Sequence, residues 1–425
     1  MKKKTKYSGE NFIEKLGPGI VTGASDDDPS GITTYTQAGS QFGLGLLWIA
    51  FLTFPLMASI QEMSGRIGLV TKKGLAEVIK ENYSKWLIFI VGIISVPAII
   101  LNLGADLAGM GAVANLIFPA LSTSYFTFMA GISIAALIVF LPYKRIEQVM
   151  KWLCVVLLVY LVVPFLVKQD LGKIFVAAVV PHIEFSKEFI AIFVAVLGTT
   201  ISPYLFFWED NMEVEHYLEK AAEGKVKNTK EVSEKTIKEM RVDNNFGMFI
   251  SNFITFFIIL TAGTVLYPNG INNIATVQDA ASALKPLAGD MAYILFATGV
   301  IGTGLLAVPV LACVCGYIFA EIFGWKEGIN TKFKESKAFY TVIVLSIITG
   351  LGINFLGINP VDALVWSAIV YGATSPLLIG VILLITNSKK IMGKWTNKWL
   401  SNVLGGACFL LMLFASFALV YTTFF

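Results

Sequence analysis

Long apolar runs separated by short polar segments recur along the whole chain. A helix needs roughly 20 mostly apolar residues to cross a bilayer, so this pattern predicts an all-α polytopic membrane protein. The eleven predicted spans are 14–40, 44–66, 86–116, 126–142, 149–168, 188–217, 244–267, 288–323, 338–356, 361–386 and 401–424. The first, third, sixth and eighth spans are longer than a straight crossing needs, so we expect them to be tilted, broken or extended beyond the bilayer.

Positive residues between the spans predict the orientation, because cytoplasmic loops carry an excess of Lys and Arg. With a cytoplasmic N-terminus, only four of the 32 Lys and Arg residues lie outside, namely Lys168, Lys173, Lys187 and Lys285. We therefore predict an inner-membrane protein with its N-terminus in the cytoplasm and its C-terminus outside. The one long polar segment, 209–243, has Glu and Lys at helical spacing, which predicts a cytoplasmic helical extension.

Composition supports a single transmembrane domain over residues 1–425, because 56% of the residues are hydrophobic and only 14% are charged. The net charge of +3 is spread between the apolar runs, which argues against a nucleic-acid partner. The four cysteines lie in apolar stretches and are expected to be buried apolar side chains. We find no H-E-x-x-H, G-x-S-x-G or P-loop motif and only two histidines, so we predict neither an enzyme nor a bound cofactor. The oligomeric state is not predicted.

The first span contains a polar run from Gly23 to Gly31, with Asp26, Asp27, Asp28 and Pro29 inside it. In lipid every backbone N–H and C=O needs a partner within the protein, so this run predicts a break in the helix near mid-membrane. The sixth span contains a second, less charged interruption over residues 198–204, with Pro203 at its centre.

The two interrupted spans are five helices apart, which is typical of a five-plus-five inverted repeat whose first helices are unwound at the membrane midplane. The predicted repeats cover about 14–168 and about 188–386, and 401–424 is an additional eleventh helix. Unwound segments expose backbone carbonyls that can bind a cation.

An ionised carboxylate inside a membrane is expensive unless it is paired, so it indicates a functional site. No Lys or Arg lies at the matching depth of the predicted spans, and a bound cation is the simplest partner for Asp28. For Asp26 and Asp27 three alternatives are open: they belong to the same site, they face an aqueous vestibule, or they are protonated.

Several segments resemble the natural resistance-associated macrophage protein (Nramp) transporters of divalent metals. The matching segments are 17–43, 61–75, 103–116, 197–209 and 299–321. The resemblance implies the LeuT-type fold, with unwound helices 1 and 6 and an added eleventh helix. It also implies a divalent metal ion as substrate and the lipid bilayer as surroundings.

The departures from the family pattern concern the metal ligands. The family's first motif is Asp-Pro-Gly-Asn, of which this chain keeps Asp28 but has Gly31 in place of the Asn. The family's second motif is Met-Pro-His, and here Ser202 replaces the Met and Tyr204 replaces the His. Loss of the thioether favours Mg²⁺ and Mn²⁺ over softer transition metals, and a roomier site suits an ion that keeps several waters. The chain is therefore most similar to the Nramp-related magnesium transporters, a prokaryotic branch, which implies a prokaryotic inner (plasma) membrane. The ligands that the resemblance implies are the Asp28 carboxylate, carbonyls near Ser25 and Thr199, and the hydroxyls of Thr200 and Ser202.

Proton coupling is expected to be weak or absent. The resemblance implies two acidic positions in helix 3, of which the first is kept as Asp106 and the second is Gly109 in this chain. It also implies histidines in helix 6, and these positions are occupied here by Tyr204 and Glu209. Histidine titrates near neutral pH and tyrosine does not. Asp106 and Glu209 remain candidate proton carriers.

Other polar residues lie inside or near the spans. Glu209 and Asp210 either form an acidic inner vestibule or end a solvated helix. Glu62 and Arg66 have the spacing of an intrahelical ion pair, and Asn102 and Asn252 are expected to form interhelical hydrogen bonds.

These observations predict a secondary transporter of divalent cations, Mg²⁺ first and also Mn²⁺, that works by alternating access. One alternative is a proton-coupled Mn²⁺/Fe²⁺ transporter. Another is a sodium-coupled amino-acid carrier of the same fold, against which the three aspartates argue, because they would repel a substrate carboxylate.

Overall fold

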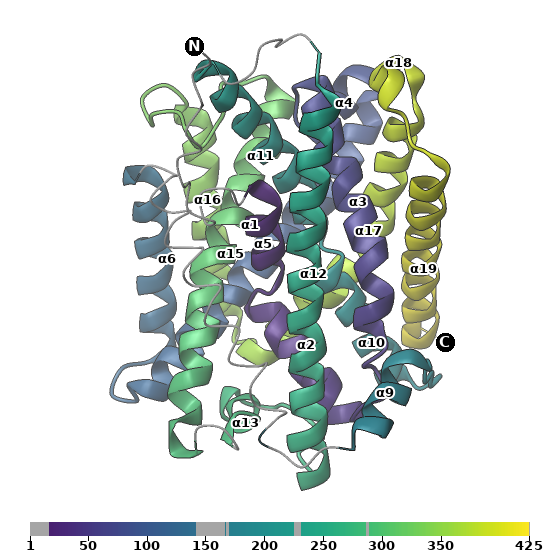
Figure 1. The fold of residues 1–425 in the computed structure, drawn as a ribbon. Helices are drawn as coiled ribbons and strands as arrows, with labels where there is room; N and C mark the ends of the chain where they lie inside the picture. Colours follow the sequence, from purple (N-terminus) through teal and green to yellow (C-terminus); the bar gives the residue numbers. More distant parts are fainter. Residues whose placement is uncertain (1–16, 142–165, 167–169, 225–230, 286–288, 425) are drawn as a thin grey trace, which may run out of the picture.

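The protein is described by a computed structural model that covers residues 17–141, 166, 170–224, 231–285 and 289–424. All regular structure in this part of the chain is helical (Figure 1). The principal helices are α3 (Ile49–Thr71), α4 (Leu75–Asn82), α5 (Lys85–Ile117), α6 (Thr123–Phe140), α9 (Leu171–Val179), α12 (Glu234–Val265), α13 (Val277–Ser282), α15 (Ala292–Phe323), α16 (Lys337–Ile353), α17 (Pro360–Asn387), α18 (Lys389–Met392) and α19 (Trp399–Phe424). The predicted span 149–168 lies almost wholly outside the described residues.

The first predicted span consists of two helices, α1 (Pro18–Asp26) and α2 (Pro29–Phe42), and the sixth of α10 (Lys187–Thr200) and α11 (Pro203–Ala222). Each second helix begins with a proline, which has no N–H to donate and is therefore suited to the first helical position. Both predicted breaks are confirmed. The third and eighth spans, by contrast, are the unbroken helices α5 and α15, of 33 and 32 residues.

Eight helical segments among the described residues are long and apolar enough to cross a membrane, and α10 with α11 counts as one of them. The connections alternate between two faces of the bundle. Figure 1 shows α4, α18 and the end of α11 at one face, with α9 and α13 at the other. This alternation agrees with the predicted order of spans, and the assignment of either face to the cytoplasm stays a prediction.

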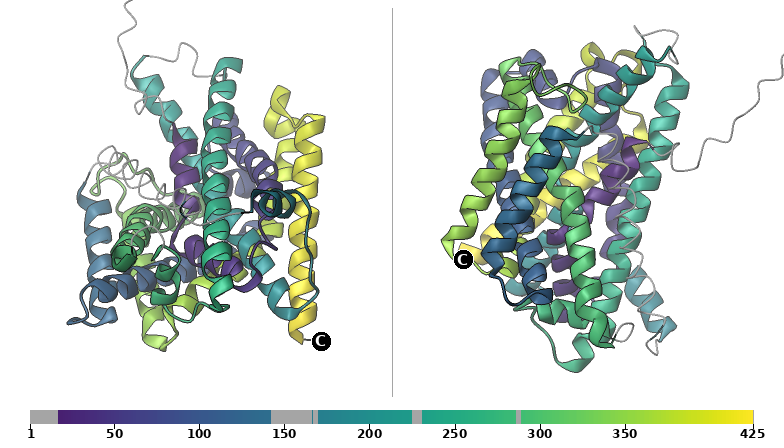
Figure 2. Two further views of the ribbon diagram at one scale, coloured as in Figure 1. Left: turned by 60° about the horizontal axis from the view of Figure 1, so that its bottom comes forward. Right: turned by 90° about the vertical axis from the view of Figure 1, so that its left-hand side faces the viewer.

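The broken helix α1–α2 crosses the interior and packs along α12, whereas α19 lies at one side of the bundle against α17 and α10 (Figure 2). Glycines bring α1 and α12 into backbone contact. A Cβ atom on Gly23 would lie 2.3 Å from the carbonyl oxygen of Gly247, and one on Gly247 would lie 2.0 Å from that of Gly19. Small residues allow such close approach between membrane helices, and here they fix the depth of α1 relative to α12.

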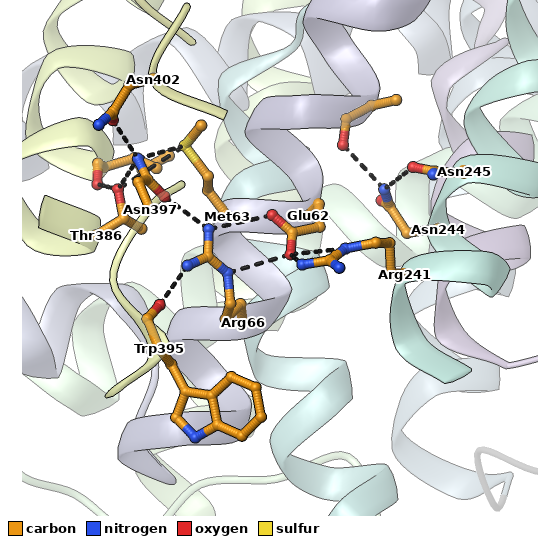
Figure 3. A network of polar contacts seen from close by, with 12 residues as sticks. Glu62, Met63, Arg66, Arg241, Asn244, Asn245, Thr386, Trp395, Asn397 and Asn402 are labelled. Carbon is orange, nitrogen blue, oxygen red and sulfur yellow. Dashed lines mark hydrogen bonds and ion pairs between the residues drawn. The ribbon is translucent and has the colours of Figure 1, made fainter. Parts of the chain in front are cut away.

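A buried polar network joins α3 to the helices around it near one face (Figure 3). Glu62 and Arg66 pair at 3.1 Å, which confirms the predicted ion pair, and Arg241 of α12 also donates to Glu62 at 2.7 Å. Arg66 further donates to the carbonyl of Trp395 and, at 2.7 Å, to the side chain of Asn397. The network therefore ties α3 to α12 and to the segment that precedes α19.

Candidate metal site

Asp28 lies at the first break, where it caps the N-terminus of α2. Its Oδ1 accepts a hydrogen bond from the Gly31 N–H at 2.6 Å, and its Oδ2 accepts one from the Asn102 side chain at 2.8 Å. The side chain is 1% exposed. A carboxylate at a helix N-terminus is stabilised by the helix dipole, and each of its oxygens keeps a lone pair for a cation.

A small space lined by oxygen atoms lies beside Gly31. A Cβ atom on this glycine would be 3.2 Å from Thr199 Oγ1, 3.3 Å from the Asp26 carbonyl oxygen and 3.4 Å from Asp28 Oδ1. These three oxygens come from α10, from the end of α1 and from the start of α2. The two breaks therefore meet at Gly31, where the absence of a side chain leaves a carboxylate, a carbonyl and a hydroxyl around one point.

The other predicted residues of the second break, Thr200 and Ser202, have hydroxyl groups that already have partners. Ser202 Oγ donates to the Thr199 carbonyl at 2.7 Å, and Thr200 Oγ1 accepts from Tyr35 of α2 at 3.0 Å while donating to the backbone of its own helix. The Ser25 carbonyl accepts a hydrogen bond from the Tyr204 hydroxyl at 2.6 Å. The α1 carbonyl that faces the space beside Gly31 is thus that of Asp26.

Behind Asp28 a hydrogen-bonded chain runs into α5 and α17. The Asn102 amide also lies 3.3 Å from Asp106 Oδ2, and Asp106 Oδ1 accepts from the Ser30 N–H at 3.2 Å. Ser367 of α17 donates to Asn102 Oδ1 at 2.7 Å. Asp106 therefore supports the N-terminus of α2 and is linked to Asp28 through one side chain.

Asp26 and Asp27 lie on the opposite side of the first break, toward α12. Ser251 Oγ of α12 donates to Asp26 Oδ2 at 2.7 Å and also lies beside the Asp27 carboxylate. Asp26 Oδ1 and the two Asp27 oxygens have no hydrogen bond of ordinary length and angle. Both side chains are fully buried. The side chain of Asp26 therefore contacts α12, whereas that of Asp28 contacts α5.

Glu209 and Asp210 follow Ser202 on α11 and are both buried, which excludes a solvated helix end at this point. The Thr22 hydroxyl of α1 donates to Glu209 Oε2. Asp210 instead lies beside Asn211, whose amide donates to Glu321 of α15 at 2.8 Å. Glu209 thus contacts α1, whereas Asp210 is linked to α15 through Asn211.

Sequence reasoning did not assign Ser251, Ser367 or Tyr35 to the site. Each is a polar residue in an otherwise apolar span, which is the only signal that the sequence carries for them. Asn102 and Asn252 were expected to form interhelical hydrogen bonds, and both do: Asn102 with Asp28, and Asn252 with Thr53 of α3 at 2.7 Å.

Comparison with known proteins identifies the family. The profile described as natural resistance-associated macrophage protein-like matches residues 19–422. The chain belongs to the Nramp family. Its relatives include proteins named divalent metal cation transporter MntH. The one from Listeria welshimeri is 24% identical over 97% of this chain and 91% of that protein, and the one from Caldanaerobacter subterraneus is 25% identical over 99% and 94%.

Solved structures agree on the fold. The manganese transporter of Eremococcus coleocola, solved with an aromatic bis-isothiourea compound, superposes with a TM-score of 0.76 at 15% identity, over 98% of this chain and 89% of that one. MhsT, solved with L-phenylalanine, gives a TM-score of 0.62 at 13% identity, over 96% and 98% of the two chains. The predicted LeuT-type fold is confirmed, and this Nramp protein is a multi-pass membrane protein.

Proposed function

We propose that this protein is a secondary transporter of divalent metal cations that binds its substrate between the two broken helices. The observation that carries the proposal is the group of oxygens around Gly31, contributed by Asp28, the Asp26 carbonyl and Thr199. Carboxylate, carbonyl and hydroxyl oxygens are the ligands that hard divalent cations prefer. The names of the relatives, divalent metal cation transporter and manganese transporter, point to the same class of substrate.

Mg²⁺ is the proposed preferred substrate, with Mn²⁺ also carried, as in the magnesium-transporting branch that the sequence resembles. The contacts around Asp28 come from oxygen and nitrogen groups, and Ser202 stands where the family has a thioether. Because Mg²⁺ gives up its waters reluctantly, a glycine at position 31 favours an ion that enters with part of its hydration shell. The residues proposed to hold the ion are Asp28, Asp26 through its carbonyl, Thr199 and, directly or through water, Ser202.

We propose that transport proceeds by alternating access, and the geometry of the two breaks supports this. The halves of each broken helix are joined by two non-helical residues, Asp27 and Asp28 in the first and Ile201 and Ser202 in the second, so they are able to tilt against the scaffold. Uptake of a divalent cation needs no coupling ion when the cytoplasm is negative, since the membrane potential contributes about 2.3 kcal/mol per charge per 100 mV. We therefore propose weak or no proton coupling.

A proton-coupled Mn²⁺ transporter is the second candidate, and one observation favours it. Asp106 is linked to Asp28 through Asn102, so a proton on Asp106 would respond to an ion at Asp28. Acidification inside liposomes during Mn²⁺ uptake supports this candidate, and uptake without any pH change supports the uncoupled one.

The experiment is uptake of Mg²⁺ and Mn²⁺ into proteoliposomes that contain the full chain or its Asp28→Ala variant. The proposal predicts flux for the wild type and its loss in the variant, and undiminished flux in the variant would remove Asp28 from the site. Substitution Ser202→Met, with Ser202→Ala as the matched control, tests the ion preference. The thioether should favour Cd²⁺ over Mg²⁺ by about tenfold, equivalent to about 1.4 kcal/mol, and an equal change in both variants would contradict a role for sulfur.

A further inference from the structure

Among the described residues, several buried carboxylates have an oxygen without a hydrogen-bond partner, and Asp27 is the one that has two such oxygens. Both oxygens of Asp28 accept hydrogen bonds. Asp26 and Asp27, by contrast, share one donor, the Ser251 hydroxyl, whose single proton goes to Asp26 Oδ2, so that three of their four carboxylate oxygens have no hydrogen bond of their own. Asp26 and Asp27 are fully buried. A buried ionised group without a partner is among the most costly features that a folded protein can contain, so its environment must supply a positive charge or a proton.

The local backbone adds to this cost. Asp26 is the last residue of α1 and Asp27 is its C-terminal cap. The C-terminal end of a helix carries a partial negative charge that disfavours nearby anions. Asp28, one residue later, is at the favourable N-terminal end of α2. The chain thus places two carboxylates where the helix dipole opposes them, and no ion pair in the described part of the chain involves either one.

Neutral oxygens from two other helices complete the surroundings. Ser251 of α12 has a single hydroxyl proton, which it donates to Asp26 at 2.7 Å. The Thr255 hydroxyl, one turn further along α12, is buried and lies beside the Tyr35 hydroxyl, but makes no hydrogen bond of ordinary length and angle. Tyr35 in turn is held by Thr200 of α10 at 3.0 Å.

We infer that Asp26 and Asp27, with the Thr255 and Tyr35 hydroxyls, form a second binding site for a hard divalent cation. The two carboxylates supply a charge that a divalent ion balances, and every ligand offered is an oxygen, as Mg²⁺ and Mn²⁺ require. The site is distinct from the space beside Gly31, because the side chain of Asp26 points to α12 while its carbonyl faces Gly31.

The glycine contacts between α1 and α12 determine where the side chains of this second site lie relative to each other. Gly23 and Gly247 hold the two backbones together, and Asp26 and Ser251 follow them by about one helical turn on each side. A cation here would bind α1 to α12 and would be released when α1 tilts away from α12. This inference rests on the proposed function in one respect, namely that the bound ion is a divalent cation of the kind that is transported.

The test counts bound Mn²⁺ per purified full-length chain by equilibrium dialysis, with free Mn²⁺ measured by electron paramagnetic resonance. We expect two ions for the wild type and one for each of Asp27→Asn, Asp26→Asn and Asp28→Asn. Thr255→Val, which conserves volume, should weaken the binding of one ion by about tenfold or more, as expected for loss of a ligand worth about 1.4 kcal/mol. Asn252→Ala, on the same helix but bonded to Thr53, is the control and should bind two ions.

A count of one for the wild type, or of two for the Asp26→Asn/Asp27→Asn double variant, would overturn the second site and would show that these carboxyls are protonated. Loss of the second ion when NaCl replaces choline chloride would overturn its assignment as a divalent site. Flux measured in proteoliposomes distinguishes failure of the second site from failure of the transport proposal. Flux that depends on Asp28 together with a single bound ion refutes the second site and leaves the transport proposal intact, whereas a wild type without flux refutes the transport proposal.

Discussion

The side-chain amide of Asn102 donates a hydrogen bond to Asp28 Oδ2 at 2.8 Å. This contact joins the continuous helix α5 to the break between α1 and α2. It orients the carboxylate toward the space beside Gly31, and Ser367 of α17 fixes the amide in turn. An unbroken helix therefore sets the position of the one carboxylate that is proposed to bind the transported ion.

Removal of this support should weaken ion binding while leaving the carboxylate present. Hydrogen bonds to charged groups contribute about 1.5–3 kcal/mol, so Asn102→Ala should raise the apparent Mn²⁺ dissociation constant by roughly 10- to 100-fold. Isothermal titration calorimetry on the purified protein measures this dissociation constant. Asn252→Ala is the control, because it removes an interhelical hydrogen bond to Thr53 away from Asp28. Equal effects of the two substitutions would mean that Asn102 acts only on stability.

The space beside Gly31 should tolerate no side chain. A methyl group there would lie 3.2–3.4 Å from three oxygens and would occupy the position proposed for the ion. We expect Gly31→Ala to reduce Mg²⁺ flux more than Mn²⁺ flux, because Mg²⁺ is expected to retain more of its water. Gly406→Ala on α19, where no atom lies within 4 Å of the added Cβ, is the matched control. Unchanged flux in Gly31→Ala would place the ion elsewhere.

The Glu62–Arg66–Arg241 network predicts unequal stability losses for two arginines that bind the same carboxylate. Arg66 is 4% exposed and Arg241 is 47% exposed at the side chain. Removing one member of a buried ion pair costs about 3–5 kcal/mol, whereas an exposed pair contributes about 0–1 kcal/mol. Thermal unfolding in detergent should therefore show a much larger drop in Tm for Arg66→Ala than for Arg241→Ala. Similar drops would show that the buried Arg66 contributes no more to stability than the exposed Arg241.

Glu327, in the segment after α15, predicts a pH dependence of stability. Burial, together with the nearby carboxylates of Glu321, Glu77 and Glu215, raises its pKa to about 9. The folded protein therefore keeps a proton that the unfolded chain releases above its ordinary pKa of about 4.3. The free energy of unfolding should consequently fall as the pH rises between these values.

Glu327→Gln should remove this contribution, so that Tm falls less steeply with pH than in the wild type. Glu335→Gln is the control. Glu335 is exposed, and its hydrogen bond with Lys326 lowers its pKa, so it is ionised in both states across this range. Identical pH profiles for the wild type and Glu327→Gln would show that Glu327 does not hold the extra proton.

The sequence was sufficient to predict the breaks, because proline and aspartate within an apolar span have few other structural roles. It also predicted the Glu62–Arg66 pair, which depends only on helical spacing. It could not predict which α1 carbonyl faces the site, since that depends on the backbone angles at Asp27 (φ −82°, ψ 54°) and not on residue type. The division between Asp28 and the pair Asp26–Asp27 was likewise not predictable, because it follows from how α1 and α2 pack against α5 and α12.

The central claim is that a divalent cation binds between the two broken helices. Crystals grown with Mn²⁺, measured at a wavelength where manganese scatters anomalously, test it most directly. The account predicts an anomalous peak in contact with Asp28, the Asp26 carbonyl and Thr199, which disappears in Asp28→Asn crystals. A peak elsewhere that persists in this variant, with nothing beside Gly31, would contradict it.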